Sequence, residues 1–159
     1  MITLMKSNLK MVEGGCVSQL VTRLFVIALV VQSSAIKADE IEQRQQAFNQ
    51  IESLTESVQK TLNGNETTWA DVEDTSIKLV AYSDMLNQAF PENSHQGSRA
   101  KLDVWQKPEK FNRLMLEMNN SYKTLLTAAN NQDEKQAKQA IKSAESTCRA
   151  CHRTYRSRW

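Results

Sequence analysis

Hydrophobic residues recur at steps of three, four and seven along most of the chain, which is the spacing of one face of an α-helix. After the first 38 residues, this pattern predicts four helices, over residues 39–62, 68–90, 108–130 and 132–157. Residues 91–106 show no clear period and are expected to form a long ordered connection. Strand-like alternation is essentially missing from the sequence, so the pattern predicts an all-α protein.

The predicted helix boundaries coincide with residues that start or stop helices. Gly64 provides a stop for the first helix, and Thr68 is placed to cap the second. Pro91 ends the second helix, and Pro108 is favourable as the first residue of the third. Asp133 lies in the turn before the fourth. Four amphipathic helices with mostly short connections bury their apolar faces most simply in an antiparallel four-helix bundle.

The first 38 residues differ in character from the rest of the chain. A start containing Lys6, Lys10 and Arg23 leads into the apolar run LFVIALVV and then into small residues. This order is typical of a secretory signal, so residues 1–38 are predicted to be a signal peptide cleaved after Ala38, with cleavage after Ala35 as the alternative. The apolar run is shorter than the roughly 20 residues that span a bilayer. A retained N-terminal anchor helix is the alternative.

Composition and charge limit the classes of protein that the chain can belong to. With 159 residues, of which only 4 are Gly and 2 are Pro, residues 39–159 fit one domain of long helices. Residues 1–38 hold four of the 20 Lys and Arg residues and one of the 18 Asp and Glu residues, so the formal charge of +2 becomes about −1 after cleavage. No basic excess remains to favour a nucleic-acid partner. No membrane association is expected once the signal is removed.

The last predicted helix contains the sequence CRACH, in which Cys148 and Cys151 precede His152. The three side chains stand at positions i, i+3 and i+4, which share one face of a helix. That face is the apolar one, so the thiols and the imidazole are predicted to point into the bundle. A covalently attached c-type haem needs this arrangement, because two thiols bind its vinyl groups and the adjacent imidazole reaches its iron. The sequence therefore predicts one haem c per chain, with His152 as the iron ligand.

The sequence leaves three other roles for the two cysteines. Structural zinc needs four ligands, and after residue 38 the chain adds only His152 and the distant His95 to the two thiols. A thioredoxin-type redox pair opens a helix after a strand, whereas this pair comes late in a helix. A local disulfide or two packed thiols, in a haem-free helical interaction module, is the third alternative.

Three segments make the chain resemble the cytochrome c′ family of class II c-type cytochromes. They are RQQAF at residues 44–48, RAKLDVW at 99–105 and CRACHRTYR at 148–156. The resemblance covers essentially all of residues 40–158. It implies a haem protein with a bundle fold and a homodimeric state. The signal predicts export to the periplasm, and no enzymatic activity is expected because no general base or nucleophile triad is encoded.

The resemblance also implies which residue faces the iron from the side opposite His152. In the family this residue stands four positions after the arginine of an Arg-Gln pair, which here is Arg44, and the position is Phe48. Low-spin electron carriers of the family have methionine there, whereas cytochromes c′ have a residue that does not bind iron. Because phenylalanine cannot coordinate iron, we expect a five-coordinate, high-spin haem that binds NO or CO.

Three further residues are expected near the haem. Arg44 is a candidate partner for a haem propionate, because a guanidinium matches a carboxylate in bidentate geometry. The resemblance implies that Arg156 lies beside the iron ligand and takes part in NO binding on that side. It also implies that Trp105 packs at the haem edge. The alternative for Arg156 is a surface position at the negative end of the last helix. The alternative for Trp105 is ordinary packing in the core.

The main alternative function is periplasmic electron transfer through a low-spin haem. This function would need a hidden sixth ligand, for which Met85, Met115 and Met118 are the candidates. Methionine on amphipathic helices more often fills gaps in a core. A redox partner protein is expected in that case, and the arginines of the last helix could attract an acidic one.

Overall fold

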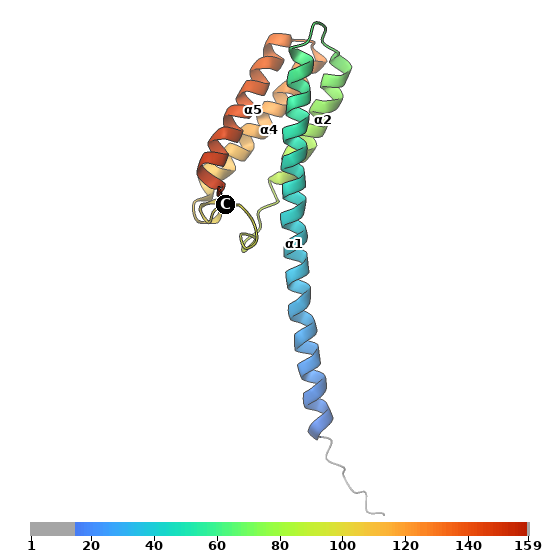
Figure 1. The fold of residues 1–159 in the computed structure, drawn as a ribbon, viewed down its shortest axis with the longest axis vertical. Helices are drawn as coiled ribbons and strands as arrows, with labels where there is room; N and C mark the ends of the chain where they lie inside the picture. The colour runs from blue at the N-terminus through green and yellow to red at the C-terminus, as the bar shows by residue number, and fades with distance from the viewer. Residues whose placement is uncertain (1–14, 159) are drawn as a thin grey trace, which may run out of the picture. The chain divides into compact units, whose positions relative to one another are not determined.

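The computed structural model describes residues 15–158 of the chain, with side chains from residue 39 onward. Its helices are α1 (Gly15–Leu62), α2 (Trp69–Leu86), α3 (Asp103–Gln106), α4 (Pro108–Asn130) and α5 (Glu134–Tyr155) (Figure 1). Outside these helices, the described residues show a single isolated β-bridge, between Ala100 and Arg156. The predicted all-α class is therefore confirmed.

The chain divides into two units, Met1–Ile36 and Lys37–Trp159. Of the predicted signal peptide, residues 1–14 lie outside the described residues, and residues 15–38 are described as helical backbone alone. Among the described residues, none of the helices has the length and apolar character needed to cross a membrane.

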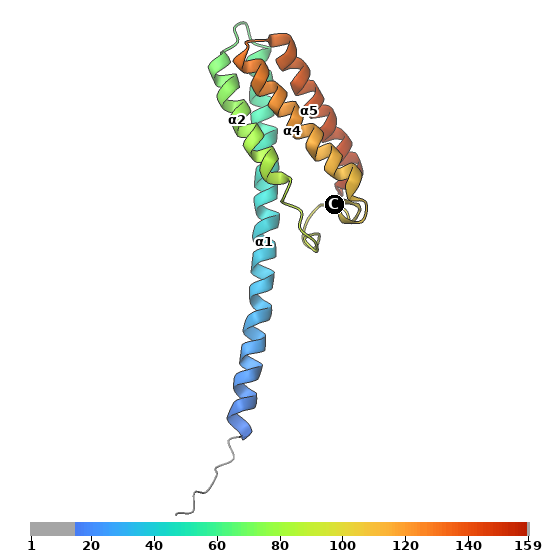
Figure 2. The same cartoon turned by 180° about the vertical axis from the view of Figure 1, so that it is seen from behind.

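In the unit that begins at Lys37, α1, α2, α4 and α5 run alternately up and down, as the two views in Figures 1 and 2 show. This arrangement confirms the predicted antiparallel four-helix bundle. Helix α4 packs against both α2 and α5. Helix α1 is joined to α4 by a 3.0 Å hydrogen bond between the hydroxyls of Thr55 and Tyr122, and to α5 by a hydrogen bond from Gln59 to Glu145.

The predicted apolar faces form the core of the bundle. Leu79 and Leu86 on α2, Tyr122 and Leu125 on α4, and Ala144 on α5 are fully buried. Burying one leucine side chain contributes about 1.5–3 kcal/mol, so these faces supply most of the stabilisation. The buried side-chain nitrogen and oxygen atoms of the described residues all have a hydrogen-bond partner.

Two helices end before the residue that the sequence predicts, and they are α2 and α5, of which α5 ends at Tyr155 instead of residue 157. Helix α2 ends at Leu86 instead of residue 90, because residues 87–89 form a turn whose amides donate to carbonyls three residues back. The carbonyl of Ala89 accepts a hydrogen bond from Arg44. Thr68 takes the N-cap position of α2 but makes no side-chain capping bond. Asp133 does cap α5, by accepting from the Gln136 amide at 2.9 Å.

The connection between α2 and α4 contains the short helix α3 and is tied to the end of α5. The Lys101 amide donates to the Tyr155 carbonyl at 2.8 Å, and the Ser157 amide donates to the Arg99 carbonyl at 2.8 Å. Near the start of the connection, the Trp105 indole donates to the Pro91 carbonyl at 2.9 Å. These bonds fix the end of the helix that carries the CRACH sequence.

Arg44 fastens the same connection to α1. Its side chain is 3% exposed, and its two Nη atoms donate to Ser94 Oγ at 2.8 Å, to the Ser94 carbonyl at 2.7 Å and to the Ala89 carbonyl at 3.1 Å. Its guanidinium carbon also lies 4.7 Å from the centre of the Phe90 ring. Burial lowers the pKa of Arg44, and the charge of Glu40 partly opposes this effect.

Replacing Arg44 with alanine is expected to lower the free energy of unfolding by about 3 kcal/mol. Hydrogen bonds from a charged donor contribute about 1.5–3 kcal/mol, and the substitution leaves their buried acceptors unpaired. Urea unfolding followed by circular dichroism measures the loss. The matched control is Arg113→Ala on α4, which removes an exposed arginine paired with Glu117 at 3.8 Å and should cost less than about 1 kcal/mol. Equal losses in the two variants would contradict this role of Arg44.

Candidate functional site

A cavity of about 400 Å³ lies between α1 and α5 and is closed at the back by α4. Pockets for small molecules and cofactors measure about 300–1,000 Å³, so the volume fits such a site. Its apolar lining residues include Phe48, Ile51, Leu114, Met115 and Met118, and polar and charged residues line it as well.

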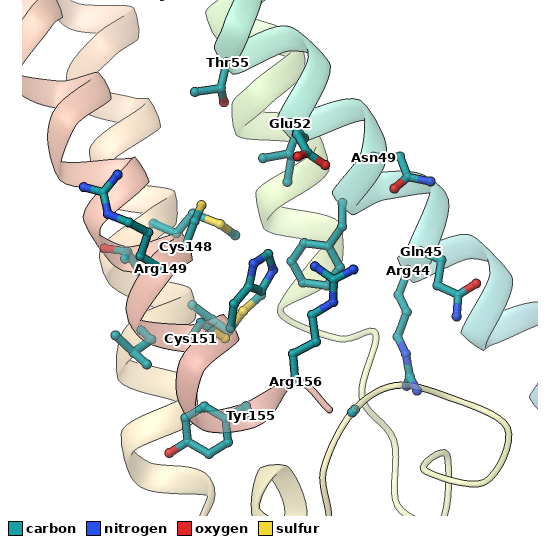
Figure 3. Close-up of a pocket in the computed structure, with 18 of the residues that line it drawn as sticks. Arg44, Gln45, Asn49, Glu52, Thr55, Cys148, Arg149, Cys151, Tyr155 and Arg156 are labelled. Carbon is teal, nitrogen blue, oxygen red and sulfur yellow. The ribbon is translucent and has the colours of Figure 1, made fainter. Parts of the chain in front are cut away.

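Cys148, Cys151 and His152 all line this cavity from α5 (Figure 3). Both cysteines are free thiols that are partly buried. Burial, and then the charge of Glu145, raises the pKa of Cys148. Burial, and then the neighbouring Cys148, raises the pKa of Cys151 to about 11. The thiols are therefore neutral at pH 7, whereas a thioredoxin-type redox pair depends on a stabilised thiolate.

His152 presents its imidazole to the same cavity. Burial, and then the charge of Arg156, lowers the pKa of His152, whereas the charge of Glu52 raises it. The net lowering favours the neutral imidazole, which is the form that binds metals. Within the described residues, no group of three or more His, Cys, Asp or Glu side chains is placed to hold a metal ion.

Phe48 lines the cavity from α1, on the wall that faces α5. Its ring is the first of an aromatic row that crosses to α5. The Phe48 and Phe90 ring centres are 6.3 Å apart, those of Phe90 and Phe111 are 4.8 Å apart, and those of Phe111 and Tyr155 are 5.3 Å apart. All three pairs meet edge to face, which is a favourable geometry for aromatic rings. The row holds the Phe48 ring in place at the cavity wall.

Arg44 and Arg156 line the end of the cavity nearest the connection between α2 and α4 (Figure 3). Trp105 does not line it. This tryptophan borders a separate surface hollow together with His95, whose ring centre is 5.9 Å away, and it meets Phe90 at 6.3 Å. The structure thus brings six of the seven predicted site residues to one cavity and places Trp105 behind Phe90.

Sequence reasoning missed two contributions to this cavity. Tyr122 is fully buried and lines the cavity beside Thr55, and burial raises its pKa strongly. Glu52 was not singled out, although it follows Phe48 by one helical turn and therefore shares its face of α1. Of the candidate sulfur ligands, Met115 and Met118 line the cavity, whereas Met85 is 43% exposed and does not.

An antiparallel bundle whose last helix presents two neutral thiols and a neutral imidazole to one apolar cavity defines a c-type haem protein. Residues 39–156 match the family model described as Cytochrome C'. The chain belongs to the cytochrome c′ family.

Solved structures of cytochromes c′ are similar to this chain. The protein from Shewanella frigidimarina is 27% identical, with a TM-score of 0.70 over 76% of this chain and 96% of that one. A ferrous arginine-to-glutamine variant from Alcaligenes xylosoxidans with bound NO is 20% identical, with a TM-score of 0.71 over 76% and 97%. A cytochrome c′ with a ligand-controlled dimer dissociation is also 20% identical, with a TM-score of 0.71 over 77% and 97%. Comparison with curated protein sequences finds no match.

The residues at the cavity fit covalent haem c, which is the cofactor of the family. Cys148 and Cys151 are free, neutral and one turn apart, as thioether attachment requires. His152 follows directly and also faces the cavity. Apolar side chains of the cavity would contact the haem macrocycle. Arg44 and Arg156 line the end of the cavity nearest the connection between α2 and α4.

Proposed function

We propose that this protein binds NO, and also CO, reversibly at a five-coordinate, high-spin haem iron, and that it sequesters NO. The observation that carries the proposal is the position of Phe48, which lines the cavity from α1 opposite the helix of His152 and has no atom able to coordinate iron. When bound, the haem would supply an iron centre able to take up a small ligand, and a one-electron couple. The NO-bound relative from Alcaligenes xylosoxidans supports this proposal.

The residues around the cavity have separate tasks in this proposal. Cys148 and Cys151 hold the haem covalently, and His152 is the protein ligand of the iron. Phe48 keeps the other side apolar and offers no hydrogen-bond donor, so polar bound O₂ gains no stabilisation there while uncharged NO and CO need none.

Arginine side chains complete the proposed site. Arg44 uses three of its five N–H groups on the connection, so its Nε–H and one Nη2–H remain available for a propionate. Arg156 lies one turn after His152 and lines the cavity on that side, where it would steady an NO molecule bound in place of the imidazole. Trp105 would act on the haem edge through Phe90.

A titration of the ferrous protein with NO and with CO tests the proposal. We expect both gases to shift the haem absorption spectrum and to be released when the gas is removed. A ferrous spectrum that neither gas changes would refute it. The function needs no general base or nucleophile, and we therefore propose binding rather than enzymatic turnover.

A second candidate function is electron transfer through a low-spin haem. Met115 and Met118 favour this function, because both line the cavity from α4 and a methionine thioether can bind haem iron. Both side chains are nevertheless buried in the bundle core, where methionine commonly fills space. A low-spin resting spectrum would favour this candidate over gas binding.

The mature protein is proposed to be an exported, periplasmic homodimer that begins at Asp39. The support is the order of basic, apolar and small residues in the first 38 positions, and a relative with a ligand-controlled dimer. Native mass spectrometry of the protein purified from cells measures both properties. We expect a chain starting at Asp39 with one haem, and two such chains per particle. A chain that retains residues 1–38 would contradict the proposed cleavage. A monomer at high concentration would contradict the proposed homodimer.

A further inference from the structure

Lys101 lies in the connection between α2 and α4, beside the last turn of the helix that carries the proposed iron ligand. Its backbone amide donates to the Tyr155 carbonyl at 2.8 Å, and its side-chain Nζ donates to the Thr154 carbonyl at 3.1 Å. Lys101 is partly buried, so water competes less for the bond that Nζ makes. One residue of the connection therefore binds two successive carbonyls of α5.

These two carbonyls belong to the part of α5 that cannot satisfy itself. The last four carbonyls of an α-helix have no amide partner within the helix. In α5 these are the carbonyls of residues 152–155, because the helix ends at Tyr155. The His152 carbonyl accepts from the Arg156 amide at 3.3 Å, which is longer than either bond from Lys101. Lys101 thus provides two of the partners that close the last turn.

The other bonds between the connection and the end of the chain lie beyond the helix. The Ser157 amide donates to the Arg99 carbonyl at 2.8 Å, and the Arg99 side chain donates to the Arg158 carbonyl at 3.2 Å. Both of these bonds involve residues that follow Tyr155, the last residue of α5. They fix the path of the chain after the helix, whereas Lys101 binds the helix itself.

The charge of Lys101 also suits its place. A cation near the C-terminus of a helix interacts favourably with the negative end of the helix dipole. Arg153 and Arg156 bring further positive charge to this end, but both are exposed, so water screens their charges more than that of Lys101. The hydrogen bond to a carbonyl of the last turn, more than the charge alone, therefore distinguishes Lys101 from these arginines.

We infer that Lys101 is a positioning residue, which holds the last turn of α5 closed and so strengthens the bond between His152 and the iron. The inference rests on the proposed function, because it needs His152 to bind the iron. An NO molecule can take the place of the imidazole only if His152 withdraws, and a helix end that is fastened to the connection resists this movement. Without the Nζ bond the Thr154 carbonyl loses this partner, and the imidazole gives way more easily.

The test compares Lys101→Met with Lys101→Arg and Lys107→Met in the ferrous holoprotein. Methionine keeps the backbone bond but removes the ammonium, and the bundle core is untouched, so the variant should fold. Arginine keeps a charged donor. Lys107→Met is the matched control, because the exposed Lys107 ammonium pairs with Asp103 of the same connection at 3.5 Å. Resonance Raman spectroscopy measures the stretching band of the bond between iron and imidazole, and stopped-flow mixing with excess NO measures the rate at which the imidazole is displaced.

We expect Lys101→Met to lower the frequency of this band and to raise the displacement rate by about two- to fivefold. Lys101→Arg and Lys107→Met should match the unmodified protein in both measurements. If Lys101→Met leaves the band and the rate unchanged, the inference is overturned even if the variant melts at a lower temperature, because Lys101 then only stabilises the fold. An equal effect of Lys107→Met would overturn it as well. If the unmodified ferrous protein shows no band of this kind, His152 does not bind the iron and the proposed function itself fails.

Discussion

The double variant Cys148→Ala, Cys151→Ala is expected to carry no haem and to fold poorly. The two thiols are the covalent attachment points, so a denaturing gel stained for haem should show no band. The cavity of about 400 Å³ would then lose the group that covers its apolar walls. Unfilled apolar volume destabilises a protein by several kcal/mol, a large share of the roughly 5–15 kcal/mol that stabilises a domain.

The control for this experiment is Ser146→Ala on the same helix. Ser146 is exposed and stands two residues before Cys148, so its loss tests whether any small change in this region prevents attachment. We expect the control to stain for haem and to unfold cooperatively on heating, and the double variant to do neither. Haem that stays with the denatured double variant would refute covalent attachment through these thiols.

Phe48→Met is expected to convert the haem from high spin to low spin. The side chain at this position lies on the cavity wall opposite the helix of His152, and the thioether of methionine binds haem iron whereas a phenyl ring does not. We expect a sulfur-to-iron charge-transfer band in the ferric visible spectrum. The affinity for CO should fall by roughly tenfold or more, which is about 1.4 kcal/mol, because the gas must now displace a ligand.

Phe48→Leu separates ligation from the loss of the aromatic ring. Leucine removes the edge-to-face contact with Phe90, at 6.3 Å, but adds no donor atom. This variant should stay high spin and bind CO. If Phe48→Met leaves the spectrum unchanged, Phe48 does not face the iron.

The helices could be predicted from the sequence because their apolar periodicity is local and strong. The third predicted helix, residues 108–130, matches α4 (Pro108–Asn130) at both ends, where Pro108 and a turn define the boundaries. The second helix ends at Leu86, four residues before the predicted end, because the amides of residues 87–89 donate to carbonyls three residues back. Apolar periodicity over residues 68–90 does not report this change of hydrogen-bond pattern.

Site residues that are neighbours in the sequence could be predicted, whereas residues that come from distant parts of the chain could not be predicted from spacing alone. Cys148, Cys151 and His152 lie within five consecutive residues, so helical spacing alone places them on one face. Phe48 is far away in the chain, and only the family resemblance connected it with them. Glu52 gave no distinct signal, because an exposed glutamate on a helix is ordinarily a solvated surface residue. The position of Trp105 depends on the path of the connection, which has no periodicity.

The central claim is that the iron is bound by His152 on one side and left open beneath Phe48 on the other. The electron paramagnetic resonance spectrum of the purified ferric protein at neutral pH tests it most directly, because this spectrum distinguishes a high-spin haem, which has no strong sixth ligand from the protein, from a low-spin haem, which has one. The account predicts a high-spin signal. A low-spin signal accompanied by a sulfur-to-iron charge-transfer band would contradict it.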